Sequence, residues 1–356
     1  MCRLSCVECT RQLIMAKRFS RIIGTVGPSQ LYWALAAARL RPEQHIGCFH
    51  YTDDSPIVVE ATRVICQAFE IAWLGDLGCP WRLWRRHYGE SRVQRIFNQI
   101  LRKQGWAECI EAALGQEMGS ADVSLVLGPT PEHRLLEPLA YGKKIDFVVD
   151  GWMWRFQESM RRTTYLARRQ GIPGYPSGMT EGAWAPPGVG ECMRDDLDIK
   201  QIPKWACDIV AEKAMMKLDC REVPLDATWV IASSDPQWLG SETDLMIRWA
   251  LQWTNPVVVK PHPRQEMRDL ERWLASHNNA DRITVLSPPA SAYPVEMLAY
   301  RFAPSRAIGP VSTALPLLKT LHNCETYVLH STIDAHLVDV CTRLGITPVH
   351  LDVNNL

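Results

Sequence analysis

Residues 21–39 read RIIGTVGPSQLYWALAAAR, and this stretch decides the fold class. A short apolar run, residues 21–26, is interrupted by glycine, proline and serine at 27–29. Proline and serine favour the first positions of a helix, and residues 30–39 are mostly alanine, leucine and aromatic residues. The pattern predicts a buried strand, a tight turn and a helix, which is the opening unit of a parallel α/β sheet.

The same alternation continues along the chain. Further strands are predicted at residues 45–51, 71–74, 123–127, 145–149, 228–232, 256–260, 283–286, 306–308 and 326–329, with helices between them. Residues 171–190 are dense in glycine and proline and are predicted to be loop. Residues 80–115 are rich in arginine and tryptophan and are predicted to be helical; they form either a solvated face or a basic aromatic surface for an anionic glycan or a membrane.

The length of 356 residues suits two domains of roughly 150 to 200 residues each. The predicted division is a flexible leader at 1–20, an N-terminal Rossmann-like domain at 21–222 and a C-terminal one at 223–356. The chain carries 39 basic and 39 acidic residues, and this zero net charge argues against a nucleic-acid partner. No window of about 18 apolar residues occurs, and the polar, basic N-terminus is a poor secretory signal, so a cytoplasmic protein is expected.

The twelve cysteines are scattered, which is typical of reduced thiols in a cytosolic protein. Cys2, Cys6 and Cys9 have a spacing that could hold an iron–sulfur cluster. They stand at the N-terminus, before any strand that could position them, so incidental cysteines in the leader are the favoured interpretation.

Several polar residues directly follow predicted strands, where α/β sheets bind ligands. Lys260-Pro261-His262-Pro263-Arg264 follows the strand at 256–260, and the two prolines fix the backbone around His262. An imidazole held there could donate a proton or a hydrogen bond to a phosphate leaving group. Lys260 and Arg264 would add positive charge beside it.

A second group begins at Gly309 and includes Ser312 and Thr313, at the start of a predicted helix. Two hydroxyls at a helix N-terminus suit a phosphate, although Ser312 could equally be an N-cap. Glu296 stands in the first turn of another helix; complementing the helix dipole is its simpler role, and binding a ribose diol is the alternative.

Asp150 follows the strand at 145–149 and could accept a proton from an attacking hydroxyl; the alternative is a turn aspartate that holds local backbone. Trp152 and Trp154 come next, and Trp184 lies in the glycine-rich segment. Their indole rings could stack on sugar rings or pack in the core.

Together these motifs resemble the bacterial sialyltransferase and polysialyltransferase group of GT-B enzymes, which use CMP-activated nonulosonic acids. That group has an acidic-acidic-Gly motif, an His-Pro motif and a Ser-Ser/Thr motif, matched in order by Asp150-Gly151, His262-Pro263 and Ser312-Thr313. The stretches GPSQLYWALAA at 27–37 and PVEMLAYRFAPSRAIGPVSTAL at 294–315 are also similar. Val149 stands where the group has its first acidic residue, which puts the identity of the base in question.

The resemblance implies a GT-B fold of two doubly wound domains facing a central cleft, and an inverting transfer from a CMP-sugar to a glycan or glycolipid. Asp150 would be the base and His262 the acid. Neither a metal nor a further cofactor is implied, and peripheral membrane contact is compatible with such an acceptor. The implied donor site comprises Lys260, Pro263, Glu296, Gly309, Ser312 and Thr313, and the implied acceptor site comprises Gln30, Trp152 and Trp154.

Three other functions fit the same sequence. A Kdo transferase, which uses the related CMP-Kdo, shares the motifs. A catalytically silent GT-B protein that binds glycan or nucleotide is favoured by Val149 and disfavoured by His262. The third alternative is an iron–sulfur enzyme, and its only support is the spacing of the three N-terminal cysteines. A UDP- or GDP-sugar enzyme would show a Glu-x7-Glu arrangement near the C-terminal phosphate site, and the sequence has none there.

Overall fold

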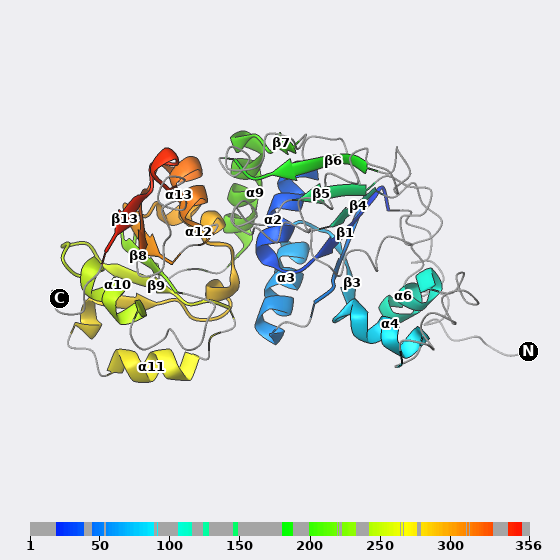
Figure 1. The fold of residues 1–356 in the computed structure, drawn as a ribbon, viewed down its shortest axis with the longest axis horizontal. Coiled ribbons are helices and arrows are strands. Elements are labelled where there is room, and N and C mark those ends of the chain that lie inside the picture. The colour runs from blue at the N-terminus through cyan, green and yellow to red at the C-terminus, as the bar shows by residue number, and fades with distance from the viewer. Residues whose placement is uncertain are drawn as a thin grey trace, which may run out of the picture.

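The computed structural model describes residues 19–38, 45–52, 55–88, 91, 106–115, 124–127, 145–148, 180–187, 199–218, 220, 223–232, 242–263, 265, 267–275, 279–310, 312, 314–329 and 341–350. Within these ranges the strands form two separate sheets, each in its own lobe of the molecule (Figure 1).

The first sheet has the order β3-β2-β1-β4-β5-β6-β7, and every described pairing in it is parallel. Its strands are β1 (Arg21–Thr25), β2 (Ile46–His50), β3 (Ala72–Asp76), β4 (Ser124–Leu127), β5 (Ile145–Val148), β6 (Thr180–Ala185) and β7 (Ile199–Gln201). The helices that accompany it are α2 (Pro28–Ala38), α3 (Pro56–Ala68), α4 (Pro80–Tyr88), α6 (Trp106–Leu114) and α9 (Lys204–Lys217).

The second sheet has the order β10-β9-β8-β11-β12-β13 and is also parallel throughout its described pairings. Its strands are β8 (Thr228–Ile231), β9 (Val257–Lys260), β10 (Ile283–Val285), β11 (Arg306–Gly309), β12 (Glu325–Leu329) and β13 (Thr347–Val349). The helical segments are α10 (Glu242–Ala250), α11 (Met267–Ala275), η5 (Ala280–Arg282), η6 (Ala290–Ala292), α12 (Val295–Phe302) and α13 (Ala314–His322).

Each sheet begins with an interior strand and grows outward first on one side and then on the other. The change of direction lies between β1 and β4 in the first sheet and between β8 and β11 in the second. Such switch points open a crevice at the carboxyl ends of the strands. The predicted α/β fold with two Rossmann-like parallel sheets is confirmed.

The central strands β8 and β9 of the second sheet are buried on both faces, which explains why they are almost continuous apolar runs. Trp229 and Val258 pack into a large cluster that also contains core residues of the first sheet, such as Ile22. The neighbouring residues Val230 and Val259 point to the opposite face and pack into a smaller cluster.

One local prediction was wrong. Residues 171–190 were expected to be loop, but β6 (Thr180–Ala185) lies within this range and pairs with β5 on one side and β7 on the other. Glycine and proline lower the local preference for a strand, and the hydrogen bonds from two neighbouring strands outweigh that preference. Trp184 is consequently a buried residue of a strand rather than a loop residue.

Helix α9 joins the two halves. The Tyr32 hydroxyl on α2 donates to the carbonyl of Cys207 on α9 over 3.1 Å, and Arg301 on α12 donates to the carbonyl of Met215 on α9 over 3.3 Å. In Figure 1 this helix stands between α2 and α12. The expected domain boundary at 222/223 follows α9 in the chain and remains a prediction.

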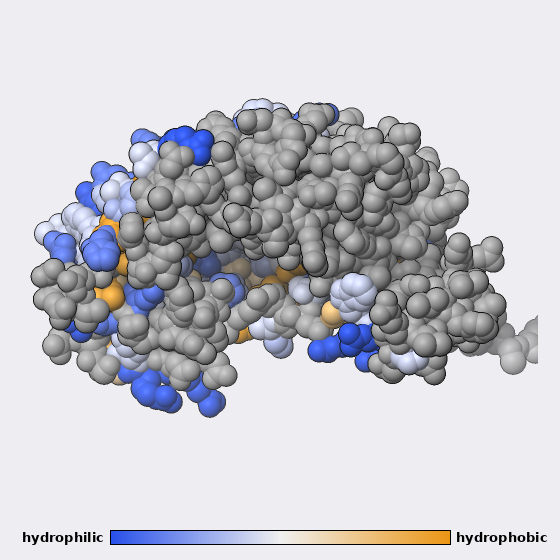
Figure 2. Space-filling model, in the orientation of Figure 1, coloured by the Kyte–Doolittle hydropathy of each residue, from blue (hydrophilic) through white to orange (hydrophobic). Residues whose placement is uncertain are grey.

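None of the described helices combines the length and the apolar character that crossing a bilayer requires. The face of the molecule seen in Figure 2 is indented between the lobe of the second sheet on the left and the lobe of the first sheet on the right.

Candidate functional site between the two sheets

The carboxyl edges of the two sheets meet at Ser55 and Pro263. Ser55 lies in the connection after β2, at the N-cap of α3, yet its hydroxyl does not cap that helix. The hydroxyl instead donates to the carbonyl oxygen of Pro263, in the connection after β9, over 3.3 Å. Residues that follow strands in one sheet therefore face residues that follow strands in the other.

The turn at His262 is fixed by Gln265 as well as by prolines. The backbone N–H of His262 donates to Oε1 of Gln265 over 3.0 Å, and the backbone N–H of Gln265 donates to the carbonyl of His262 over 2.9 Å. Gln265 is buried and His262 is half-buried. The imidazole thus stands on a rigid turn at the junction, and the sequence analysis did not single out Gln265 as its support.

Lys260 lies deeper than the sequence analysis assumed. Its side chain is 7% exposed, and its ammonium group donates to the carbonyl of Ser291 on η6 over 2.8 Å. Burial lowers the pKa of Lys260 to about 8, and the negative charge of Glu296 acts in the opposite direction. Lys260 therefore does not lie at the surface of the site beside His262. Its positive charge acts on the site electrostatically, from the protein interior.

Glu296 lies in the first turn of α12 and is 3% exposed. Its backbone carbonyl accepts a hydrogen bond from Nε2 of His322 over 2.8 Å. Burial raises the pKa of Tyr32 on α2, and the charge of Glu296 contributes to this shift, which places the carboxylate near the first half of the molecule. A ribose could reach Glu296 only if this junction opened, so the ribose-binding role stays a prediction.

Ser312 lies in the connection between β11 and α13, three residues after the strand ends and two residues before the helix begins. Its hydroxyl oxygen is buried and has no hydrogen-bond partner among the described residues. It therefore does not act as an N-cap in this structure, and it is available to a ligand at the helix N-terminus. Gly309 has a packing role: a Cβ there would lie 3.2 Å from Cβ of Ile231 and 3.3 Å from its carbonyl oxygen.

Gln30 is 2% exposed and lies in the first turn of α2. Its Oε1 accepts a hydrogen bond from the backbone N–H of Val26 over 2.7 Å. Its Nε2 is buried without a hydrogen-bond partner in the described part of the chain. This amide nitrogen lies at the switch point of the first sheet, which is compatible with the expected role of Gln30 in binding an acceptor. That role stays a prediction, because no described contact tests it.

The structure adds a pair that the sequence analysis missed. His50 ends β2 and Asp76 ends β3, and Nδ1 of His50 lies 3.0 Å from Oδ1 of Asp76. Both residues were visible in the sequence near the ends of predicted strands. Only the pairing of β2 with β3 brings them together, because they stand 26 positions apart in the chain.

Several expected site residues lie outside the described residues, so their predicted roles remain predictions. They are Val149, Asp150, Trp152, Trp154, Arg264 and Thr313. The N-terminal cysteines Cys2, Cys6 and Cys9 also lie outside these residues.

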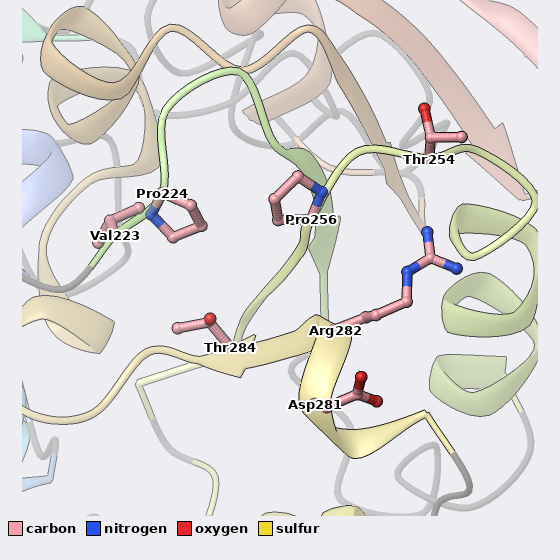
Figure 3. Close-up of a pocket in the computed structure, with 7 residues that line it drawn as sticks. All are labelled: Val223, Pro224, Thr254, Pro256, Asp281, Arg282 and Thr284. Carbon is pink, nitrogen blue, oxygen red and sulfur yellow. The ribbon is translucent and has the colours of Figure 1, made fainter.

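A pocket of about 500 Å³ lies at the opposite edge of the second sheet, near the amino ends of its strands. Figure 3 shows its lining, which includes Pro224, Pro256 and Arg282. The Arg282 guanidinium donates to the carbonyl oxygens of Leu251 and Trp253, where α10 ends. This arginine secures a helix end, and the pocket lies away from the carboxyl edge where such sheets bind ligands.

No protein-family model matches the chain, and no curated protein matches its sequence. Among solved structures, spinosyn forosaminyltransferase SpnP is similar at 12% identity over 96% of this chain and 87% of that chain, with a TM-score of 0.46. The glycosyltransferase VinC in complex with dTDP is similar at 11% identity over 93% and 86%, with a TM-score of 0.47. MurG from Acinetobacter baumannii is similar at 11% identity over 93% and 85%, with a TM-score of 0.42.

With identities of 11–12% and TM-scores below 0.5, these likenesses decide nothing about the donor or the acceptor. The GT-B type predicted from the sequence corresponds to the observed architecture of two Rossmann-like parallel sheets whose carboxyl edges meet.

Proposed function

We propose that the protein transfers a nonulosonic acid from its CMP-activated form to a hydroxyl of a glycan or glycolipid, with inversion. The observation that carries the proposal is the junction at Pro263. This residue contacts Ser55 of the first half, and its neighbour His262 stands on a turn held by Gln265. An acid at that position is suited to act on a leaving group bound between the two sheets.

The second sheet supplies the donor side. The hydroxyl of Ser312, which is buried and has no hydrogen-bond partner among the described residues, stands just before α13 and is suited to a phosphate oxygen; Thr313 would be the next donor. β9 and β11 flank β8, so their carboxyl ends are about 10 Å apart, a distance that one nucleoside monophosphate can span. Lys260 adds positive potential from below the site, which stabilises the charge of the departing phosphate.

The first sheet supplies the acceptor side in this proposal. Gln30 lies at its switch point, and Asp150, Trp152 and Trp154 follow β5 in the sequence. The resemblance assigns the base to Asp150. A donor with one phosphate needs no metal to bridge a diphosphate, and the chain's own donors and charges would stabilise the leaving CMP.

The test is calorimetric titration of the protein with CMP, CDP, UDP, GDP and dTDP, the last being the nucleotide of the VinC structure. We expect selective binding of CMP, weakened in His262→Ala and unchanged in His45→Ala. His45 is an exposed histidine at the beginning of β2, so its variant controls for the loss of an imidazole. Binding without preference for CMP, or no effect of His262→Ala, would refute the proposal.

The same preparation separates the related functions. Release of CMP from CMP-N-acetylneuraminic acid but not from CMP-Kdo supports the nonulosonic acid donor, and the reverse supports a Kdo transferase. Selective CMP binding without release from either donor supports the silent binding protein, for which Val149 is the sequence argument.

A further inference from the structure

Three side chains form a row across the carboxyl edge of the first sheet. In the parallel pairing, Thr25 on β1 is opposite His50 on β2, and His50 is opposite Asp76 on β3. Residues in register on neighbouring strands project from the same face of a sheet. The hydroxyl of Thr25 already has a partner in the next turn, because it donates a hydrogen bond to the carbonyl of Gly27 over 2.8 Å. His50 and Asp76 are the members of the row that can act on a ligand.

Among the described residues, the imidazole of His50 has a hydrogen-bond partner at one of its two nitrogens. Its Nδ1 lies 3.0 Å from Oδ1 of Asp76, and this carboxylate oxygen also accepts the backbone N–H of Gly78 over 2.9 Å. The His50 side chain is 0% exposed, and its Nε2 has no hydrogen-bond partner among the described residues. A buried polar atom left unpaired costs about 1–3 kcal/mol, so its persistence at a ligand-binding edge indicates a partner that is bound during function.

The partner of Nδ1 decides what Nε2 can do. An ionised carboxylate can only accept hydrogen bonds. Nδ1 of His50 therefore carries the hydrogen and donates a hydrogen bond to Asp76. In the neutral ring, Nε2 then has the free lone pair and can accept a proton. This is the arrangement of a general base with an orienting group.

We propose that His50 is the base of the transfer and that Asp76 is its positioning residue, an inference that rests on the proposed function. The acceptor O–H bond breaks and its proton passes to Nε2 of His50. The freed oxygen forms a bond with the anomeric carbon of the donor. The bond from that carbon to the phosphate oxygen breaks, and its electron pair leaves with CMP on the side of His262.

This assignment explains the residue at the first acidic position of the resembled motif. Val149 cannot accept a proton, so the base at that position is missing from this chain. His50 provides a base on the same sheet, and its strand is separated from β5 by β1 and β4. Because the ring is buried, an acceptor reaches Nε2 only when the residues that cover it move apart.

The test measures CMP release from CMP-N-acetylneuraminic acid and from CMP-Kdo, with water as the acceptor. We expect His50→Gln to slow release at least 100-fold while the dissociation constant for CMP changes less than twofold. His45→Gln, in the residue directly before the same strand, is the control and should behave like the wild type. Release by His50→Gln within threefold of the wild type would overturn the proposal, and release abolished by Asp150→Asn alone would return the base to Asp150.

A second readout does not need turnover. In ¹⁵N-histidine-labelled wild-type protein, we expect the ring of His50 to be protonated at Nδ1 and unprotonated at Nε2, and Asp76→Asn to change this tautomer balance. A His50 ring protonated at Nε2 in the wild type would refute the base even if His50→Gln failed to fold. If the wild type binds no CMP, the proposed function fails and the role of His50 fails with it, whereas an active His50→Gln leaves the proposed function intact.

Discussion

The ammonium group of Lys260 lies 2.8 Å from the carbonyl oxygen of Ser291, in the interior beside the junction of the two halves. Among the described residues, one backbone carbonyl is the hydrogen-bond partner of this charge. The negative charge of Glu296 also favours the protonated lysine. The protein thus keeps a lysine in a position where its protonated form is penalised by desolvation.

The pH dependence of stability should reveal this lysine. Its pKa is about 8 in the folded protein and near 10.5 when unfolded, so above pH 8 the unfolded chain holds a proton that the folded protein has lost. The free energy of unfolding should therefore rise with pH between about 8 and 10.5 because of this group. The difference between wild type and Lys260→Met, measured by urea denaturation, should change in that window by on the order of 3 kcal/mol.

Lys217→Met serves as the control for that measurement. Lys217 is exposed at the end of α9, and its variant should follow the wild-type stability curve across the window. Parallel curves for wild type and Lys260→Met would show that Lys260 is not desolvated as the structure indicates.

Gly309→Ala should destabilise the second sheet. The new Cβ would come within 3.3 Å of both Cβ and the carbonyl oxygen of Ile231, and neither atom can rotate away. We expect a loss of about 1–3 kcal/mol in the free energy of unfolding. The control is Gly27→Ala, in the turn after β1, where the new Cβ would meet Cγ1 of Val58 at an ordinary 3.5 Å. Equal stabilities for the two variants would contradict this packing argument.

Tyr32→Phe should weaken the attachment of α9 to α2. Burial raises the pKa of Tyr32, so the phenol stays protonated and donates a hydrogen bond to the carbonyl of Cys207. Removing this hydroxyl should cost about 1 kcal/mol in thermal or urea unfolding. Tyr327→Phe removes a hydroxyl whose partner Glu325 is exposed, and it should change stability by less than about 0.5 kcal/mol. A larger loss in Tyr327→Phe than in Tyr32→Phe would be inconsistent with the structure.

Ser312→Ala should weaken CMP binding about tenfold without lowering stability. The wild-type hydroxyl is buried and unpartnered in the described structure, so its removal costs the free protein no hydrogen bond. Titration calorimetry and urea denaturation of the same sample separate the two effects. Ser287→Ala, an exposed serine after β10, is the control. Unchanged affinity in Ser312→Ala would remove this serine from the donor site.

The sequence predicted the parallel α/β fold because buried strands of two parallel sheets carry a strong local signal. Val257–Lys260 and Thr228–Ile231 are almost purely apolar, and polar residues or turns follow them. It failed at Thr180–Ala185, where the strand exists because β5 and β7 pair with it rather than through its own composition.

The candidate site shows the same division. His262 was predictable because flanking prolines and the end of a strand are local features. The burial of Lys260 and Glu296 was not, because it depends on how α12 and η6 pack against the first half of the molecule. The contact of His50 with Asp76 was also beyond prediction, since it requires the register of β2 on β3.

Helix α9 gives its backbone carbonyls to both halves, to Tyr32 on one side and to Arg301 on the other. The two halves are therefore not interchangeable parts. A chimaera that kept this chain through residue 222 and took its remainder from another protein with two parallel α/β sheets would set α9 against a foreign counterpart of α12. Recombination of the two halves would preserve these contacts only when α9 and α12 are inherited together.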